Sequence, residues 1–369
     1  MSAVRRRPLA FLVLLAGLVL VAPAAHPVGA QPNSLEPPRQ LSPGVYAILQ
    51  RHPMIISDSN VLLIINDDDV VVVDANILPG SARKVIGEIR KLTSKPVRYV
   101  INTHWHSDHH YGNAVYREAF PGVEFIQHVN TRREIIERDM PALAKNVETG
   151  YPDQIARIRR ALETGKTSTG ADVTPEMRTS FTNLLPIYEA FVAEMKATPL
   201  IPGTLVVQDS LVLHRGDRSI VVKYLGRGNT AGDLVVYLPK ERLVATGDLV
   251  VHPIPFAFFS HLGDWPHTLR ALKGIDAATI MPGHGPMMTD WKYVDQLIPL
   301  IESTWEQVQR AVASGADLEA TRKRVNLDRF VDLFAGPDER NRRQFGNLFQ
   351  NPAVEAAFNE LRPDSTRKN

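Results

Sequence analysis

The sequence predicts an α+β fold, a β-rich sandwich of two halves, and three observations support this prediction. Runs rich in Val and Ile precede a segment with helical spacing of apolar residues, and the same succession recurs later in the chain. No Gly/Ser linker or low-complexity tract divides the 369 residues. We therefore expect one large domain with insertions and a tail.

The first half is predicted from its Val- and Ile-rich runs. Asp67-Asp68-Asp69 is a turn-forming cluster that joins two of these runs as a hairpin. Apolar residues between Val85 and Leu92 have helical spacing, and this segment ends before Pro96. The expected strands are 44–51, 60–66, 70–74 and, fully buried, 97–101.

The second half repeats this order, and helical segments lie between and after the two halves. Residues from about 130 to 200 have helical spacing and are longer than a connection needs, so we expect a helical insertion that acts as a lid, as scaffold or as a dimer surface. The chain after Pro286 is predicted to be helical, including 293–312 and 330–361. Strands are expected at 205–213, 219–225, 233–238, 243–245 and 277–281, with a helix at 265–272.

The N-terminus has the three-part layout of a secretory signal peptide. Arg5-Arg6-Arg7 precede an apolar run from Leu9 to Ala22, and Val28-Gly29-Ala30 is a small-residue cleavage signature. That run is shorter than the ~20 residues of a membrane-spanning helix, so we expect no stable anchor after cleavage. We predict a periplasmic or secreted protein, exported by the general or the twin-arginine route. The predicted divisions are the signal peptide at 1–30, the main domain at 31–300 and a helical C-terminal extension at 301–369.

Composition restricts the metal ligands and the partners. The chain has no cysteine, so any metal must be held by nitrogen and oxygen. Three of the 42 basic residues lie in the first 30 residues, and the other 39 face 40 acidic residues, which gives the mature chain a net charge of −1. No Lys/Arg-rich block is present in the mature chain, so we expect a small-molecule substrate and no nucleic acid. The oligomeric state is left open.

Four potential metal ligands lie within six residues. His104, His106, Asp108 and His109 can each donate a lone pair to a divalent cation at neutral pH. They follow the last predicted strand of the first half, at the carboxyl end where open α/β sheets usually place their chemistry. A solvated loop with surface histidines is the alternative, but it does not explain the alternation with an acid.

This run resembles the signature of the metallo-β-lactamase superfamily, His-x-His-x-Asp-His. The segment 102–113 is similar to the first ligand loop of that family, Thr246-Gly247-Asp248 to its bridging-carboxylate loop, and Met281-Pro282-Gly283-His284-Gly285 to its last histidine loop. Gly-Asp and Pro-Gly-His also occur in ordinary turns, but their order here supports the resemblance over about residues 42 to 290. The resemblance implies an αββα sandwich with a metal cluster at one rim.

The resemblance also implies a set of metal ligands. His104 and His106 would belong to a first site, Asp108, His109 and His284 to a second site, and Asp248 would bridge the two.

Asn229, in Gly226-Arg227-Gly228-Asn229-Thr230, stands where the family normally has the third histidine of the first site. A neutral amide oxygen is a weaker zinc ligand than imidazole, so we expect one tightly bound zinc at the second site and a second zinc bound weakly. Asn229 is then a weak ligand, a hydrogen-bond donor to bound water or substrate, or a sign of lost catalysis.

The chemistry implied by the resemblance is hydrolysis by a metal-activated water. The metal lowers the pKa of bound water toward ~7, and Asp108 and Asp248 are the expected catalytic residues that orient the water and move protons. Esters, lactones, β-lactams and phosphate or sulfate esters are candidate substrates. The alternatives are a metal-binding protein of this fold with reduced or lost catalysis and an iron-dependent oxidoreductase, which is disfavoured because di-iron members carry an acid where His106 stands.

A few residues outside the motifs are predicted to support the site. Asp74 ends a predicted strand, and we expect it to hydrogen-bond the ligand loops. His110 is interpreted as a helix-start or supporting residue rather than a ligand. The aromatic run 252–259 is either an apolar pocket wall or a packed loop fixed by its prolines. The histidines without ligand spacing are His52, His128, His214, His261 and His267.

Overall fold

The computed structural model describes residues 35–50 and 58–362 of the chain. The predicted signal peptide at 1–30, together with His52, lies outside the described residues. Within the described residues, no helix has the length and apolar character needed to cross a membrane.

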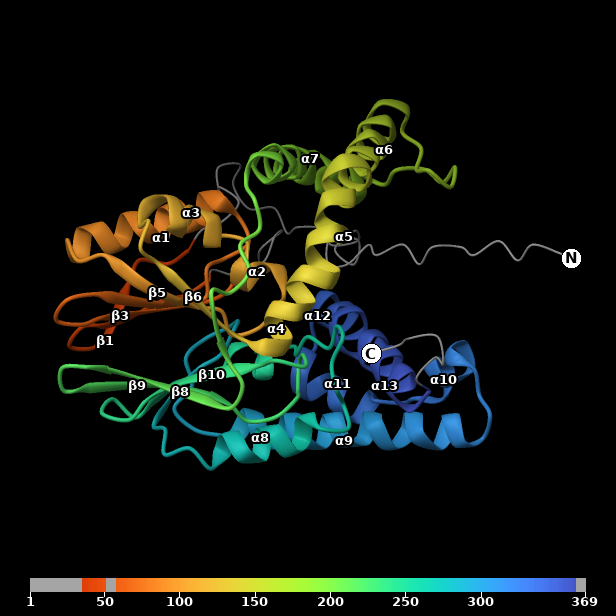
Figure 1. The fold of residues 1–369 in the computed structure, drawn as a ribbon. Coiled ribbons are helices and arrows are strands. Elements are labelled where there is room, and N and C mark those ends of the chain that lie inside the picture. The colour runs from red at the N-terminus through yellow and green to blue at the C-terminus, as the bar shows by residue number, and fades with distance from the viewer. Residues whose placement is uncertain (1–34, 51–57, 363–369) are drawn as a thin grey trace, which may run out of the picture.

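Two mixed β-sheets form the centre of the fold (Figure 1). In the larger sheet, neighbouring strands follow the chain order; the first four strands pair antiparallel, and the remaining pairs are parallel. Its strands are β1 (Arg39–Ser42), β2 (Val45–Ile48), β3 (Val61–Ile65), β4 (Val70–Val73), β5 (Val97–Ile101), β6 (Glu124–His128) and β7 (Leu205–Val207).

The smaller sheet contains the second half of the sandwich. Its strands pair antiparallel except for the last two in the chain, which are parallel. In spatial order they are β12 (Thr279–Met281), β11 (Leu243–Ala245), β10 (Leu234–Leu238), β9 (Arg218–Tyr224) and β8 (Ser210–Arg215).

Helices cover the outer faces of both sheets, which makes four layers (Figure 1). α1 (Pro79–Leu92) and α3 (Asn113–Ala119) pack on the larger sheet, and α8 (Trp265–Lys273) and α9 (Lys292–Ala313) pack on the smaller one. Successive side chains of a strand point to opposite faces, so Leu62 and Ile64 pack between the sheets whereas Val61 and Leu63 pack under α1 and α3. This arrangement confirms the predicted αββα sandwich.

The segment between β6 and β7 is helical, as predicted. It has its own apolar cluster, which includes Leu143, Phe181 and Phe191. Its elements are α4 (Val129–Glu134), the π-helical turn η1 (Ile135–Asp139), α5 (Met140–Lys145), η2 (Asn146–Gly150), α6 (Tyr151–Thr164) and α7 (Pro175–Ala197).

The C-terminal region is also helical and shares one apolar core with α8 and α9. The predicted division at residue 300 falls inside α9, so a continuous helix rather than a linker crosses it. The remaining elements are α10 (Leu318–Arg324), α11 (Asp328–Ala335), α12 (Glu339–Gln344), η4 (Phe345–Gln350) and α13 (Asn351–Leu361).

Some predicted elements differ from those observed. The run 205–213 was predicted as one strand, but it forms β7 at the edge of the larger sheet and β8 at the edge of the smaller sheet. A continuous apolar run does not show which sheet each part joins, because its local pattern is the same in either. The stretch 330–361 is divided among several helices, and β1 and β6 were not predicted.

Candidate metal centre

The predicted metal ligands gather at one rim of the sandwich, on loops that follow three strands. α2 (Ser107–His110) lies after β5, the short helix η3 (Gly247–Leu249) lies after β11, and the last loop follows β12. Because β11 and β12 run parallel, their carboxyl ends are adjacent. The side chains brought together there are all buried: His104, His106, Asp108, His109, Asp248 and His284.

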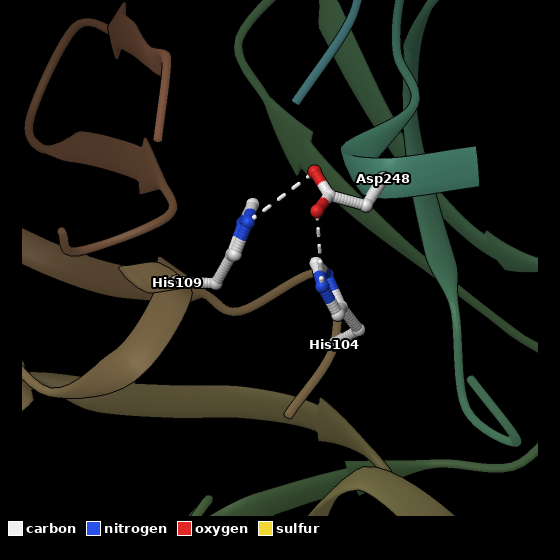
Figure 2. Close-up of side chains that lie close together, drawn as sticks. All are labelled: His104, His109 and Asp248. Atoms are coloured by element: carbon white, nitrogen blue, oxygen red, sulfur yellow. Dashed lines mark ion pairs between the residues drawn. The ribbon is translucent and has the colours of Figure 1, made fainter. Parts of the chain in front are cut away.

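The carboxylate of Asp248 lies between two histidines (Figure 2). Its Oδ2 is 3.6 Å from His104 Nε2, and its Oδ1 is 3.4 Å from His109 Nε2. On the other side of His109, Asp108 Oδ2 is 3.4 Å from His109 Nε2 and 2.8 Å from His284 Nε2. Two groups of potential ligands therefore share His109, namely His104 with His109 and Asp248, and Asp108 with His109 and His284.

Three of these four separations, 3.4 to 3.6 Å, fit a bound divalent cation, and the fourth, 2.8 Å between Asp108 and His284, is that of a hydrogen bond. Two ligand atoms that are each about 2.1 Å from a tetrahedral zinc ion lie roughly 3.4 Å apart. Four buried atoms that could ligate a metal also have no hydrogen-bond partner within the described part of the chain: His106 Nε2, His109 Nε2, Asp248 Oδ1 and Asn229 Oδ1. Buried polar atoms without a partner are costly unless an ion or a water uses them, and this set of nitrogen and oxygen atoms suits zinc or a similar cation.

Two histidines of the cluster are held by contacts from behind. Asp74 Oδ2 is 2.8 Å from Nδ1 of His109, and Asp74 Oδ1 accepts a hydrogen bond from the backbone N–H of Thr103 at 2.8 Å. Gln50 Oε1 is 2.9 Å from Nδ1 of His284. In both histidines Nε2 therefore faces the cluster. The supporting role predicted for Asp74 is confirmed.

Burial and charge set the ionisation of this part of the cluster. Burial alone raises the pKa of Asp108, but His109 and His284 outweigh it and hold that pKa well below its usual range. Burial alone lowers the pKa of His109, but the carboxylates of Asp74, Asp108 and Asp248 outweigh it and raise the pKa well above its usual value. Asp108 is therefore an ionised carboxylate at neutral pH.

The other two histidines have a different environment. Burial and the neighbouring His109 and His106 lower the pKa of His104 well below its usual value. Burial lowers the pKa of His106 to about 4, although Asp248 and Asp108 oppose this effect. Both imidazoles are neutral at pH 7, and His104 Nε2 lies 3.0 Å from His106 Nδ1.

Asn229 is fully buried, and its amide is held in one orientation. Its Nδ2 donates a hydrogen bond to the carbonyl oxygen of Phe256 at 2.6 Å. Its Oδ1 has no hydrogen-bond partner in the described ranges. The amide thus offers its oxygen, which can ligate a cation or accept a hydrogen bond from water.

Two glycines in the ligand loops are required by close packing. A Cβ on Gly283 would lie 2.0 Å from Oδ1 of Asp248. Gly247 has φ +52°, and a Cβ there would lie 2.6 Å from Oγ1 of Thr103. Side chains at these positions would displace the carboxylate or the ligand loop.

Sequence reasoning missed several residues that hold the ligand loops. Asn60 Nδ2 donates to the backbone oxygens of Pro282 and Gly285, on either side of His284. Asp139, in η1 of the insertion, accepts a hydrogen bond from the Tyr111 hydroxyl at 2.9 Å and lies 3.0 Å from Nε2 of His110. The only sequence signal was the polar character of Asn60 and Gln50 beside apolar strands. His110 has the supporting role that was predicted.

The aromatic run 252–259 packs beside the cluster. The ring of Phe256 is 5.1 Å from that of His284, and the ring of Phe259 is 5.3 Å from that of Trp105. Trp105 is in turn 5.1 Å from the ring of His106. The histidines predicted to be ordinary do not join the cluster; His128 stacks on Tyr224, and the others in the described ranges are His214, His261 and His267.

Comparison with known proteins places this site in a family. The model of the metallo-beta-lactamase superfamily matches residues 56–284, which are more than half of the chain. The chain belongs to the metallo-beta-lactamase superfamily. A curated relative, the linear primary-alkylsulfatase of Pseudomonas sp. (strain ATCC 19151), is 25% identical over an alignment of 244 residues, which covers 63% of this chain and 42% of the alkylsulfatase. The chain thus spans less than half the length of that relative.

A solved structure of the superfamily has the same fold. The metallo-beta-lactamase from Pontibacter korlensis matches with a TM-score of 0.50 and 16% identity, over 73% of this chain and 99% of that chain. At this identity the likeness concerns the fold alone. The division of the six ligands between two superfamily sites, and the place of Asn229 in the first of them, stay predictions.

Proposed function

We propose that this protein is an exported, zinc-dependent hydrolase that uses an activated water to cleave an ester, lactone, β-lactam or related bond of a small molecule. The observation that carries the proposal is the buried cluster of four histidines and two aspartates, whose donor atoms converge at separations that suit a divalent cation. The superfamily is hydrolytic in type, and the relative named as an alkylsulfatase supports sulfate esters among the candidate substrates.

The cluster supplies the ligands, and the metal supplies the activation. His104, His106, Asp108, His109, Asp248 and His284 would hold the cation. A bound divalent cation lowers the pKa of water and polarises the oxygen of the bond under attack. The two oxygens of Asp248 face different histidines, so this carboxylate can connect two ligand groups.

The protein side chains orient the reactants. Asp108 is ionised, so its carboxylate can accept a hydrogen bond from the attacking water and fix the direction of its lone pair. Asn229 Oδ1 can accept a second hydrogen bond from the same region. Asp74 and Gln50 keep two of the histidines in place, which keeps the cluster rigid while the reaction proceeds.

The second candidate function is a metal-binding protein with reduced or lost catalysis. Asn229 favours it, because the superfamily pattern has a histidine at this position and an amide oxygen is a weaker zinc ligand than imidazole. An iron-dependent oxidoreductase of the same fold is the third candidate, and the histidine at position 106 argues against it.

Metal content and turnover on the same sample distinguish these functions. Purified full-length protein is assayed for zinc and iron, then tested with nitrocefin, a lactone, an aryl ester and an aryl sulfate. We expect bound zinc and turnover of at least one substrate. Asp248→Ala should lower that turnover by more than the roughly 10–100-fold that loss of an outer supporting residue costs, whereas His267→Ala, an exposed histidine on α8, should not.

Each other outcome selects an alternative. No bound metal after zinc reconstitution would contradict the proposal. Zinc without turnover on any substrate would support the metal-binding alternative, and bound iron with redox activity would support the oxidoreductase. Export is tested separately by sequencing the N-terminus of protein from the periplasm or medium, where we expect the chain to begin after Ala30.

A further inference from the structure

Arg138 belongs to the helical insertion, but the structure fixes it beside the ligand loop. It lies in the π-helical turn η1, next to Asp139. Asp139 binds both the Tyr111 hydroxyl and the ring of His110, which directly follow the ligand His109. These buried contacts leave η1 little freedom to move relative to the metal centre.

The guanidinium of Arg138 lies over two aromatic rings that border the ligands. Its Cζ is 5.1 Å from the centre of the Trp105 ring and 4.7 Å from that of the Phe259 ring. Trp105 stands between the ligands His104 and His106 in the chain. Phe259 has φ +63°, a conformation rare for a bulky residue, and such backbone strain clusters at functional sites. The charge is therefore held at the edge of the cluster by a strained loop and a ligand-loop residue.

Arg138 keeps most of its hydrogen-bonding capacity. One nitrogen, Nη1, donates to Glu134 Oε1 at 3.3 Å, which is the one hydrogen bond that the side chain makes with the described residues. A guanidinium has five N–H donors in a planar fork. The side chain is 32% exposed, compared with 15% for Glu134, so the remaining donors can be reached from solvent.

A second arginine adds positive charge on the same side. Burial and the charges of Arg227 and Arg138 lower the pKa of His261 to about 4, although Asp264 opposes them. His261 lies two residues after the aromatic run, and Arg227 is in the loop of Asn229. Both arginines have a carboxylate partner, but Arg227 is paired with Asp264 at 2.5 Å, whereas Arg138 is paired with Glu134 at the longer distance of 3.3 Å. Arg138 is therefore the better candidate for an external anion.

We propose that Arg138 binds an oxyanion of the substrate and thereby selects anionic esters, either carboxylic esters that carry a free carboxylate near the bond that is cleaved or sulfate esters. A planar guanidinium is suited to either group because it can donate two parallel hydrogen bonds to them. This inference rests on the proposed hydrolytic function, and it adds the charge of the substrate and the residue that recognises it.

Three 4-nitrophenyl compounds separate charge recognition from catalysis: the neutral acetate, the anionic succinate monoester and the sulfate ester. In Arg138→Gln we expect KM to rise at least about tenfold for the anionic compounds that the wild type cleaves, with kcat within about twofold and the acetate unaffected. Comparing the succinate monoester with the sulfate ester shows which oxyanion is preferred. The matched control is Arg133→Gln, which removes an exposed arginine of α4 and should leave every KM unchanged.

Several results would overturn the inference. One is an equal rise in KM for neutral and anionic esters in Arg138→Gln, which would mean that Arg138 only packs against Trp105 and Phe259. Another is a wild type that cleaves the acetate alone, and a third is an equal effect of Arg133→Gln. If Arg138→Gln does not fold, Arg138→Lys keeps the charge but not the planar fork and should show a smaller, equally selective rise in KM.

A binding measurement keeps the test independent of turnover. Inorganic sulfate is titrated into the metal-loaded protein while tryptophan fluorescence is followed, with Trp105→Phe to assign the signal. We expect a saturable change that weakens at least about tenfold in Arg138→Gln but not in Arg133→Gln. If no ester is cleaved but sulfate binding depends on Arg138, the proposed function fails and the oxyanion site stands. If sulfate causes no change in the wild type, the oxyanion site is contradicted.

Discussion

The two metal sites that the superfamily pattern predicts share Asp248, but the residues behind their histidines differ. On one side, His109 is backed by the carboxylate of Asp74, and Asp108 adds a second charge. On the other side, His104 Nδ1 is 3.0 Å from the neutral hydroxyl of Thr103, and Asn229 adds only a neutral amide. Ligands bind a divalent cation through negative charge as well as through lone pairs. The site that contains Asp108 and His109 should therefore be the stronger one.

The largest effect should come from removing Asp108. Asp108→Ala takes a buried carboxylate from between His109 and His284, and we expect the protein to lose its tightly bound zinc. His106→Ala should retain that zinc, because it alters the weaker site. The zinc content of each variant is measured after dialysis against a weak chelator, and circular dichroism checks that the variant is folded. The comparison fails if His106→Ala loses the tight zinc and Asp108→Ala keeps it.

A second prediction strengthens the weaker site instead. Asn229→His replaces the neutral amide with an imidazole, so we expect zinc bound after dialysis to rise from one to two per chain. Asn229→Gln, which keeps the amide, is the matched control and should remain at one. Two zinc ions held equally tightly by the wild type would show that Asn229 does not weaken the site.

The third prediction concerns the support of His109. Asp74→Asn removes the charge behind its Nδ1 while keeping the shape, so zinc affinity should fall about 10–100-fold. A competition titration with a chromophoric chelator gives the affinity. Asp67→Asn, in the hairpin turn between β3 and β4, is a control that also removes one carboxylate. An unchanged affinity in Asp74→Asn would mean that the hydrogen bond positions the loop without affecting the metal.

The parts of the molecule that sequence predicted are those set by local pattern. The strand 97–101 was predicted with its observed bounds, because four of its five residues have high strand propensity and a polar loop follows it. Four ligand residues were predicted from their spacing within 104–109, and Asp248 and His284 from the resemblance to the superfamily; the structure places all six together. Gln50, Asp139 and Arg138 were not foreseen, because each meets the site through contacts with residues far away in the chain. Long-range partners of this kind leave no periodic signal in one sequence.

The smallest expected effect is a difference in the number of protons that the protein releases when it binds the first and the second zinc ion. Burial lowers the pKa of His104 and His106, so both are neutral at pH 7 in the metal-free protein. The carboxylates around His109 raise its pKa well above the usual value, so it is protonated at pH 7 and must lose a proton to bind a cation. Burial lowers the pKa of His284 in the same site, but Asp248 and Asp108 outweigh it and raise that pKa as well, so the first zinc should release at least one proton at pH 7. A second zinc, added in excess, should release fewer.

Calorimetric zinc titrations in buffers of different ionisation enthalpy count these protons. Because the pKa of His109 is raised, the release should diminish, and the affinity for the first zinc should increase, as the pH rises toward that pKa. Asp74→Asn takes away one of the charges that raise this pKa, so the variant should release fewer protons at pH 7. Equal release by both zinc ions would show that the two sites have the same electrostatic environment, in conflict with the charge difference between Asp74 and Thr103.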